Sequence, residues 1–366
     1  MNANEQRLHY PFATPPEPGH TLVIAPGVKW LRMKLPFALD HINLWLLADT
    51  FEGREGWTII DTGVALPATR DAWERVLAHE LEGKPIVRVM ITHAHPDHVG
   101  NAGWLCERFD VPFWAAPGEY FLARVLNHGM PGFDNESQVK HFRRHGLPEA
   151  MLAEMHATRQ DYYRKLVPSV PLAYTRMREH DLVKIGSGIA SSEGNQWRVI
   201  SGFGHSPEHA ALYCAQLGIL ISGDMLLPRI STNVGVWPNE PEMSSVRLFL
   251  ESIDQFRALP ADTLVLPSHG LPFTGAHERV QQLHDHHAER LGALEARLQE
   301  ASAAGQALTA YDVVPVLFSR ALDSHQMVFA IGESVAHLHY LRDTGRVASR
   351  RDADGVTRFV ATAQPT

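Results

Sequence analysis

Residues 92–100, with the sequence THAHPDHVG, place four potential metal ligands within six positions. They are three imidazoles and one carboxylate, contributed by His93, His95, Asp97 and His98. Burying such groups without a partner is costly in free energy, so a cluster of four requires a compensating interaction, which a metal ion provides. His93 and His95 face the same side of an extended loop. Asp97 and His98 follow where the chain turns, and they can face a second ion.

The segments on either side of this motif would hold it in place. Residues 87–91 are β-branched and apolar, which predicts a short buried strand. Residues 101–109 predict a helix. A loop between a strand and a helix is fixed by the sheet and can position ligands. The alternative is a polar loop that is rich in histidine by chance. It is the weaker interpretation, because isolated histidines are uninformative in a chain with 22 of them but the ordered string H-x-H-x-D-H is not.

Further motifs follow in an order that resembles a known family. They are IIDTG at 59–63, GHSPEH at 204–209, ISGD at 221–224 and LPSHG at 266–270. With the THAHPDHVG string, they resemble the signature of the metallo-β-lactamase-fold hydrolases over roughly residues 20–290. The resemblance implies an α+β fold, a four-layer αβ/βα sandwich with the metals at one edge of two packed sheets. The pattern of expected strands and helices alone indicates only a mixed α/β protein.

The resemblance also implies a role for each motif residue. The expected ligands are His93, His95 and His205 for a first ion, Asp97, His98 and His269 for a second, and Asp224 as a bridge between both. Asp61 would lie beneath the site and orient the ligand loop by hydrogen bonds. Asp97 and Asp61 are therefore the expected catalytic carboxylates. His209 is expected to support a ligand by hydrogen bonding or to be structural, and not to bind a metal ion itself.

The chemistry of such a site is hydrolysis. Imidazoles and carboxylates suit zinc, and iron or manganese can use the same ligands, so we expect two zinc ions with iron or manganese as alternatives. A water shared by two ions has its pKa lowered to about 7, and the resulting hydroxide would attack a carbonyl group. The chain contains neither a G-x-S-x-G motif nor a P-loop. We therefore expect a binuclear metal-dependent hydrolase that acts on a thioester, an ester or a lactone.

The substrate class is less constrained than the reaction. Members with β-lactamase activity usually lack an aspartate at the position of Asp224, and lactonases often carry a tyrosine shortly after it. Here Met225, Leu226 and Leu227 follow. The glutathione-binding region of hydroxyacylglutathione hydrolases is not recognisable. Three alternatives stay open: a nuclease that acts on RNA, an iron-dependent persulfide dioxygenase, and a binding module without catalysis.

The segment between His98 and His205 is longer than a compact member of the family needs, and it predicts a helical insertion at about 119–181. Residues 137–178 carry eight lysines and arginines against three acids. One interpretation is a lid that recognises an anionic tail of the substrate. The other is a solvated helical face or a contact in a homodimer.

The C-terminal region adds a long helix at 276–304, whose His284, His286 and His287 we expect to serve packing and hydrogen bonding. Two helices at 310–319 and 324–344 and a hairpin follow, and they resemble the winged-helix appendage of some family members. Residues 308–366 carry six arginines and six acids, and this balance argues against nucleic-acid binding. The expected domains are an N-terminal arm at 1–19, a catalytic domain at 20–304 and a winged-helix-like domain at 305–366.

Composition indicates the setting of the protein. The net charge of −8, from 33 basic and 41 acidic residues, disfavours nucleic acid as a partner. No stretch approaches the roughly 20 apolar residues that span a bilayer, and the N-terminus has no hydrophobic signal segment. Cys106 and Cys214 have neither pair nor metal spacing, which indicates buried free thiols. We expect a cytoplasmic protein with a small-molecule acyl substrate.

Overall fold

The computed structural model describes residues 5–186 and 195–362. The chain folds into two compact units, each assembled from three segments. Unit 1 comprises residues 1–128, 163–232 and 253–280, and unit 2 comprises residues 129–162, 233–252 and 281–366. All the expected metal ligands belong to unit 1. The domain boundaries expected after residues 19 and 304 stay predictions. Residues 1–4 of the expected arm and 363–366 of the expected C-terminal domain lie outside the described residues.

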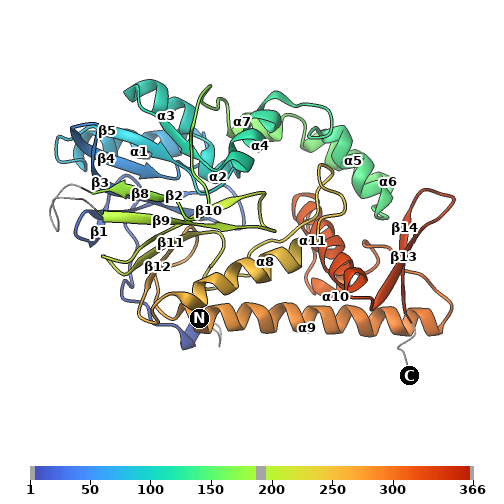
Figure 1. Cartoon of the computed structure of the whole chain (residues 1–366). Helices are drawn as coiled ribbons and strands as arrows, with labels where there is room; N and C mark the ends of the chain where they lie inside the picture. The colour runs from blue at the N-terminus through green and yellow to red at the C-terminus, as the bar shows by residue number, and fades with distance from the viewer. Residues whose placement is uncertain (1–4, 187–194, 363–366) are drawn as a thin grey trace. The chain divides into compact units, whose positions relative to one another are not determined.

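Two β-sheets form the centre of unit 1 (Figure 1). The first has the strand order β1-β2-β3-β4-β5-β6-β7, with the bounds Leu22–Ala25, Val28–Lys34, His41–Phe51, Arg54–Ile60, Ile86–Met90, Phe113–Ala115 and Thr175–Arg176. The second has the order β12-β11-β10-β9-β8, with the bounds Leu264–Pro267, Ile219–Gly223, His209–Cys214, Asn195–Gly202 and Leu182–Ile185. Pairing is antiparallel from β1 to β4 and parallel from β4 to β7. In the second sheet only β11 and β12 pair in parallel among the described strands.

Apolar side chains from both sheets pack into one core between them. Trp30 and Trp45 of the first sheet stack on each other, and Trp197 of the second sheet is buried in the same core. Helices α1 (Pro67–His79) and α3 (Ala102–Phe109) cover the other face of the first sheet (Figure 1). β5 lies between these layers and is buried at every position, as a strand covered on both faces must be. The expected α+β sandwich is confirmed.

The strand directions explain why distant motifs meet. Carboxyl ends of parallel neighbours lie at the same edge of a sheet. In the first sheet, β4 ends directly before Asp61, and its parallel neighbour β5 ends shortly before the 92–100 segment. In the second sheet, β11 ends directly before Asp224, and its parallel neighbour β12 ends two residues before His269. His205 lies in the connection between β9 and β10. The first sheet thus supplies two of the five motifs, and the second sheet supplies the other three.

The range 119–181, for which the sequence predicts a helical insertion, is mostly helical. It contains α4 (Pro117–His128), α5 (Asn135–Arg144), α6 (Glu149–Thr158) and α7 (Tyr162–Leu166), followed by strand β7 of the first sheet. Further elements of the chain are α2 (Pro96–Val99) within the ligand motif, α8 (Ser245–Asp254), α9 (Ala276–Ala303), α10 (Val314–Leu317), α11 (Ser324–Asp343) and the hairpin of β13 (Val347–Arg351) and β14 (Thr357–Ala361). The helix expected at 310–319 is thus reduced to the single turn of α10. α11 begins with a capping box between Asp323 and Gln326.

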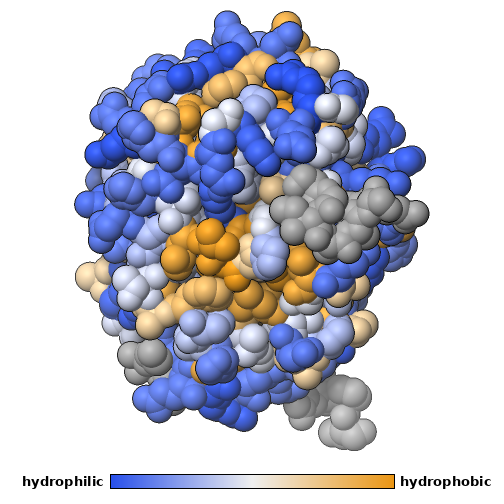
Figure 2. All heavy atoms as spheres, turned by 90° about the vertical axis from the view of Figure 1, so that its left-hand side faces the viewer, coloured by the Kyte–Doolittle hydropathy of each residue, from blue (hydrophilic) through white to orange (hydrophobic). Residues whose placement is uncertain are grey.

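Figure 2 shows one face of the molecule, on which apolar residues gather between polar residues above and below. Exposed apolar side chains include Val23 of β1 and Leu182 of β8, the edge strands of the two sheets. Each of these strands is only four residues long, which limits pairing with another chain. Within residues 5–186 and 195–362, every helix is too short or too polar to cross a bilayer.

Candidate metal centre

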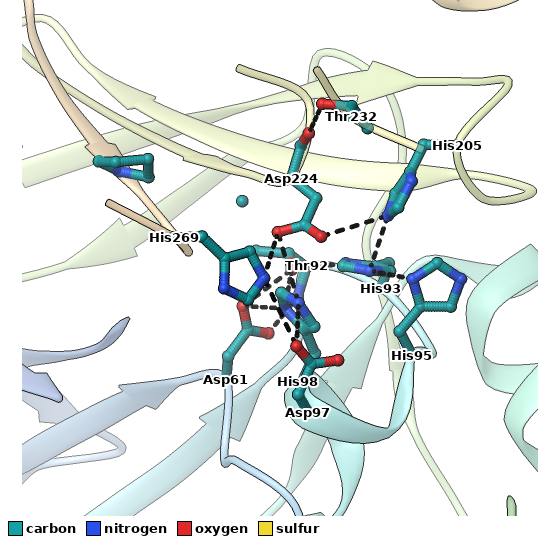
Figure 3. A network of polar contacts seen from close by, with 12 residues as sticks. Asp61, Thr92, His93, His95, Asp97, His98, His205, Asp224, Thr232 and His269 are labelled. Atoms are coloured by element: carbon teal, nitrogen blue, oxygen red, sulfur yellow. Dashed lines mark hydrogen bonds and ion pairs between the residues drawn. The ribbon is translucent and has the colours of Figure 1, made fainter. Parts of the chain in front are cut away.

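The seven expected ligands lie together in unit 1 (Figure 3). They form two groups, His93 with His95, His205 and Asp224, and Asp97 with His98 and His269. In each group, one nitrogen or oxygen atom from every member lies within 4.8 Å of the others. All are buried except His95 and Asp97, which are partly exposed. A sheltered set of converging nitrogen and oxygen atoms can hold a cation.

In the first group, ring nitrogens converge on a common point. His93 Nε2 lies 2.8 Å from His95 Nδ1 and 3.2 Å from His205 Nε2. Burial, reinforced by the neighbouring imidazoles, holds the pKa of His93 and the pKa of His95 well below the usual value. Both rings are therefore neutral at pH 7 and present lone pairs. Neutral imidazole is the form that binds a metal ion.

Asp224 lies between the two groups. Its Oδ2 is 3.4 Å from His205 Nε2 of the first group. Its Oδ1 is 3.5 Å from His98 Nε2 and 3.4 Å from His269 Nε2 of the second group. Each carboxylate oxygen thus faces a different set of imidazoles. This is the arrangement that a carboxylate shared by two cations requires.

The backbone around Asp224 is fixed by its neighbours. The Asp224 N–H donates to His209 Nε2, 3.2 Å away, and the Thr232 hydroxyl donates to the Asp224 carbonyl oxygen. Gly223 has a φ of 53°, and a Cβ there would lie 2.1 Å from His209 Nε2, so this position requires glycine. His209 belongs to neither ligand group. Its contact with the Asp224 backbone places it beside the ligands, and its role stays a prediction.

The second group combines two imidazoles with a carboxylate. Asp97 Oδ2 lies 3.5 Å from His269 Nε2 and 3.7 Å from His98 Nε2. Burial lowers the pKa of His98, but the carboxylates of Asp61, Asp97 and Asp224 outweigh it and raise that pKa to about 10. Burial also lowers the pKa of His269, but Asp224 outweighs it and raises that pKa above its usual value. At neutral pH a cation would therefore displace protons from this group.

Two buried atoms support a cation at this place. His98 Nε2 and Asp224 Oδ1 each lack a hydrogen-bond partner among the described residues. Buried polar atoms in proteins are nearly always paired, and an exception needs an explanation. A divalent ion between these atoms would provide one, and the nitrogen and oxygen donors match the preferences of zinc, iron and manganese. The residues present therefore fit a metal ion.

Asp61 anchors the ligand loop from below. Its Oδ1 accepts a hydrogen bond from the Thr92 N–H at 2.7 Å, and its Oδ2 accepts from the Thr92 hydroxyl at 2.8 Å. Oδ2 also lies 2.8 Å from His98 Nδ1, so the opposite nitrogen of that ring points into the site. Asp61 has a φ of 61°, a strained conformation for a residue with a side chain. Such strain at the end of a buried strand is typical of functional sites.

Sequence reasoning missed the residue that fixes the His269 loop. The buried side-chain amide of Asn43 donates to the carbonyl oxygens of Pro267, at 2.8 Å, and Gly270, at 3.0 Å. His269 Nδ1 lies 2.7 Å from the His41 carbonyl oxygen, which turns Nε2 toward the site. Asn43 and its partners are more than 200 positions apart in the chain. No local pattern marks such a residue.

Comparisons with known families agree with the motifs. Residues 39–269 match the model of the Metallo-beta-lactamase superfamily, and this range includes all seven expected ligands. Residues 297–362 match a second model, described as the Metallo-beta-lactamase-like, C-terminal domain. The two matches together cover most of the chain.

Individual relatives span almost the whole chain. A protein of Bacillus subtilis named Probable metallo-hydrolase YqjP is 25% identical over 329 residues, which are 87% of this chain and 93% of the relative. A solved structure from Burkholderia ambifaria, described as a Beta-lactamase domain protein, has a TM-score of 0.90 at 46% identity and covers 99% of this chain and 100% of its own. The metallo-beta-lactamase family protein TTHA1429 from Thermus thermophilus has a TM-score of 0.74 at 28% identity, with 93% and 100% covered.

Proposed function

We propose that this chain, which belongs to the Metallo-beta-lactamase superfamily, is a hydrolase that uses two divalent metal ions to cleave a thioester, an ester or a lactone. The coarse class, a metal-dependent hydrolase, is that of the Bacillus subtilis relative's name. The observation that carries the finer proposal is the position of Asp224, whose two oxygens face two separate groups of ligands. A site for a single ion has no need of the second group.

The residues that would hold the ions follow from the two groups. His93, His95 and His205 would bind one ion, Asp97, His98 and His269 the other, and Asp224 both. When bound, such ions lower the pKa of a shared water and polarise a substrate carbonyl. We propose zinc for both, with iron or manganese compatible with the same donors.

The protein's own groups would orient this reaction and move its protons. The Asp97 side chain is 18% exposed and lies against His269 and His98. It can therefore contact both a bound metal ion and an entering substrate. We assign it the role of accepting the proton of the attacking water. Asp61 is buried and contacts Thr92 and His98, so it would act by holding that imidazole in place. The substrate would be a small acyl compound whose carbonyl carbon is attacked at the site.

The basic stretch of the insertion supports the solvated-face interpretation better than a lid. In unit 2, the Arg143 guanidinium pairs with Glu149, and both side chains are exposed. The Arg159 guanidinium lies over the Tyr162 ring, 4.8 Å from its centre, and its Nη1 lies 3.3 Å from His325 Nδ1 of α11. Arg143 thus lies on a solvated face, Arg159 lies in a contact within unit 2, and both already have partners. We also propose that the helices and hairpin of the C-terminal region form a winged-helix-like domain with a structural role.

Metal analysis combined with a substrate panel tests the proposed function. The purified protein would be assayed for bound metals, and its activity on thioesters, lactones, β-lactams and RNA would be measured with and without a chelator. We expect about two metal ions per chain and chelator-sensitive cleavage of an acyl substrate. One iron per chain with oxygen consumption would instead indicate a persulfide dioxygenase. Cleavage of RNA with steep salt dependence of binding would indicate a nuclease.

A further inference from the structure

We propose that Glu119 is a positioning residue for the first ligand group, because its single carboxylate holds both of the loops that carry the histidines of that group. The inference rests on the proposed function, since it concerns the same metal centre. Glu119 lies in the first turn of α4. Nothing in its sequence context distinguishes it from an ordinary acid at the start of a helix.

The two carboxylate oxygens have different partners. Glu119 Oε2 accepts a hydrogen bond from the Ala94 N–H, and Oε1 accepts one from the Glu208 N–H, both at 2.7 Å. Ala94 lies between His93 and His95, and Glu208 lies in the loop of His205. A carboxylate is rigid and planar, so the separation of its oxygens sets the separation of the two loops. The three histidines thereby keep their mutual distances before any ion arrives.

A second contact locks the same segments together. The Glu208 side chain accepts a hydrogen bond from the Gly118 N–H at 2.9 Å, so Glu208 and the start of α4 each bind the other's backbone. A Cβ at Gly118 would lie 3.1 Å from Glu208 Cβ, which shows how closely the segments approach. The Tyr163 hydroxyl donates to the Ala94 carbonyl oxygen at 2.8 Å. The peptide groups on both sides of Ala94 are therefore held.

Burial affects the ionisation of both Glu119 and Tyr163. Burial raises the pKa of Glu119, against the lowering effect of the two backbone N–H groups. Burial and the neighbouring Glu119 raise the pKa of Tyr163 well above its usual value, so the tyrosine remains a hydrogen-bond donor. Glu119 is fully buried, and burying a carboxylate is costly. Only a carboxylate offers acceptors at both oxygens; an amide of the same shape offers one.

Glu119→Gln tests the inference by direct measurement of metal binding. The substitution keeps the shape of the side chain but leaves one backbone N–H without its acceptor. We expect the affinity for the ion of the first ligand group to fall by about 10- to 100-fold, the range typical of residues that orient ligands, with the ion of the second group unaffected. Competition with a chelator gives the two affinities, and the absorption bands of the Co²⁺-substituted protein report the geometry of each site. His205→Ala and His269→Ala identify which bands belong to which group.

A matched control separates positioning from general stability. Glu333→Gln changes another buried glutamate, in unit 2, where Arg290 and Asn233 are its partners. It should alter the melting temperature and leave both metal affinities at the wild-type values. Tyr163→Phe, which removes one hydroxyl, should weaken the same ion as Glu119→Gln by a smaller factor, and it covers the case in which Glu119→Gln does not fold.

Two results would overturn the inference. One is wild-type affinity for both ions in Glu119→Gln, or in Tyr163→Phe if only that variant folds. The other is an equal loss at both sites that follows the loss of thermal stability. These outcomes differ from a failure of the proposed function, in which the wild-type protein itself binds no metal or binds metal but cleaves none of the acyl substrates.

Discussion

Buried histidines cluster in both units of this protein, and among residues 5–186 and 195–362 only the cluster in unit 1 brings three or more ligand atoms together. In unit 1, the imidazoles of His98 and His269 lie against the carboxylates of Asp97 and Asp224. In unit 2, His287 Nδ1 lies 3.0 Å from His337 Nε2. The histidines there bind one another and the backbone, and the described part of unit 2 contains no group of three converging ligand atoms.

The pKa values of the buried histidines differ between unit 2 and the second ligand group of unit 1. Burial lowers the pKa of His287 to about 2, with a further contribution from His337. Burial also lowers the pKa of His337 to about 4. In unit 1, burial likewise lowers the pKa values of His93 and His95, but in the second ligand group carboxylates outweigh burial and raise the pKa of His98 to about 10. Carboxylates among the imidazoles, and not the number of histidines, therefore distinguish a candidate metal centre from a packed core.

The largest expected effect comes from removing a carboxylate of unit 1. Asp224→Ala and Asp97→Ala should each reduce kcat/KM by about 10³-fold or more, because ions held in place stabilise the transition state by several kcal/mol. Circular dichroism should show that both variants remain folded, since the sheets have their own apolar core. His287→Gln, which changes a buried histidine of unit 2, should keep its turnover. Near-normal activity in either aspartate variant would show that the ligand roles are wrong.

A smaller effect is expected from the carboxylate beneath the site. Asp61→Asn keeps the size of the side chain but weakens the hold on Thr92 and His98, so metal affinity should fall by about 10- to 100-fold. Chelator competition measures the change. Asp49→Asn is the matched control, because Asp49 is also buried in unit 1 but pairs with Arg88. If both variants lose stability and neither loses metal affinity, Asp61 serves folding alone.

Acid should destabilise the metal-free protein, and the buried histidines of unit 2 contribute to this. The pKa values of His287 and His337 in the folded state lie below the usual 6.5, so the unfolded chain binds more protons below that pH. Stability present above pH 6.5 is then lost as the pH falls toward 4, by about 1.4 kcal/mol per pH unit for each histidine. Glu333 acts in the opposite direction: its pKa is raised to about 7, so its contribution is lost as the pH rises from 4.5 through 7.

Denaturant unfolding between pH 7 and pH 4.5 measures this slope. His287→Gln should reduce the slope of the free energy of unfolding against pH by the contribution of one histidine. Glu333→Gln should increase that slope. A stability that is independent of pH in this range, in the wild type and in both variants, would contradict the neutral buried state of these histidines.

The smallest effect is expected at the exposed arginine of the insertion. Arg143→Ala removes a surface pair with Glu149, and such pairs contribute little to stability. The melting temperature and the activity on acyl substrates with an anionic tail should stay within error of the wild type. A selective rise in KM for the anionic substrates would favour the lid interpretation.

The sequence was sufficient for the features that are local in the chain. The ligand string, the strand before it and the helix after it could be predicted because each has its own periodicity or spacing. The assembly of unit 2 could not, because it depends on contacts between distant segments. The Tyr311 N–H donates to the His145 carbonyl oxygen at 3.1 Å, for example, and joins the insertion to the C-terminal region.

Positioning residues escaped prediction for a related reason. Glu119 and Asn43 act on backbone groups of other segments, so neither belongs to a motif. The helix expected at 310–319 is reduced to α10 for a local reason. The segment contains three valines and Pro315, which are poor formers of a helix interior. Thr309 and Asp312 also bind each other's backbone N–H groups in a turn before α10.

Elemental analysis of active protein that has not been exposed to a chelator decides whether the two ligand groups hold metal ions. We expect about two divalent ions per chain in the wild type and a substoichiometric content in Asp224→Ala, whose missing carboxylate faces both ligand groups. Full activity in a preparation that contains no metal would show that the proposed metal centre is wrong.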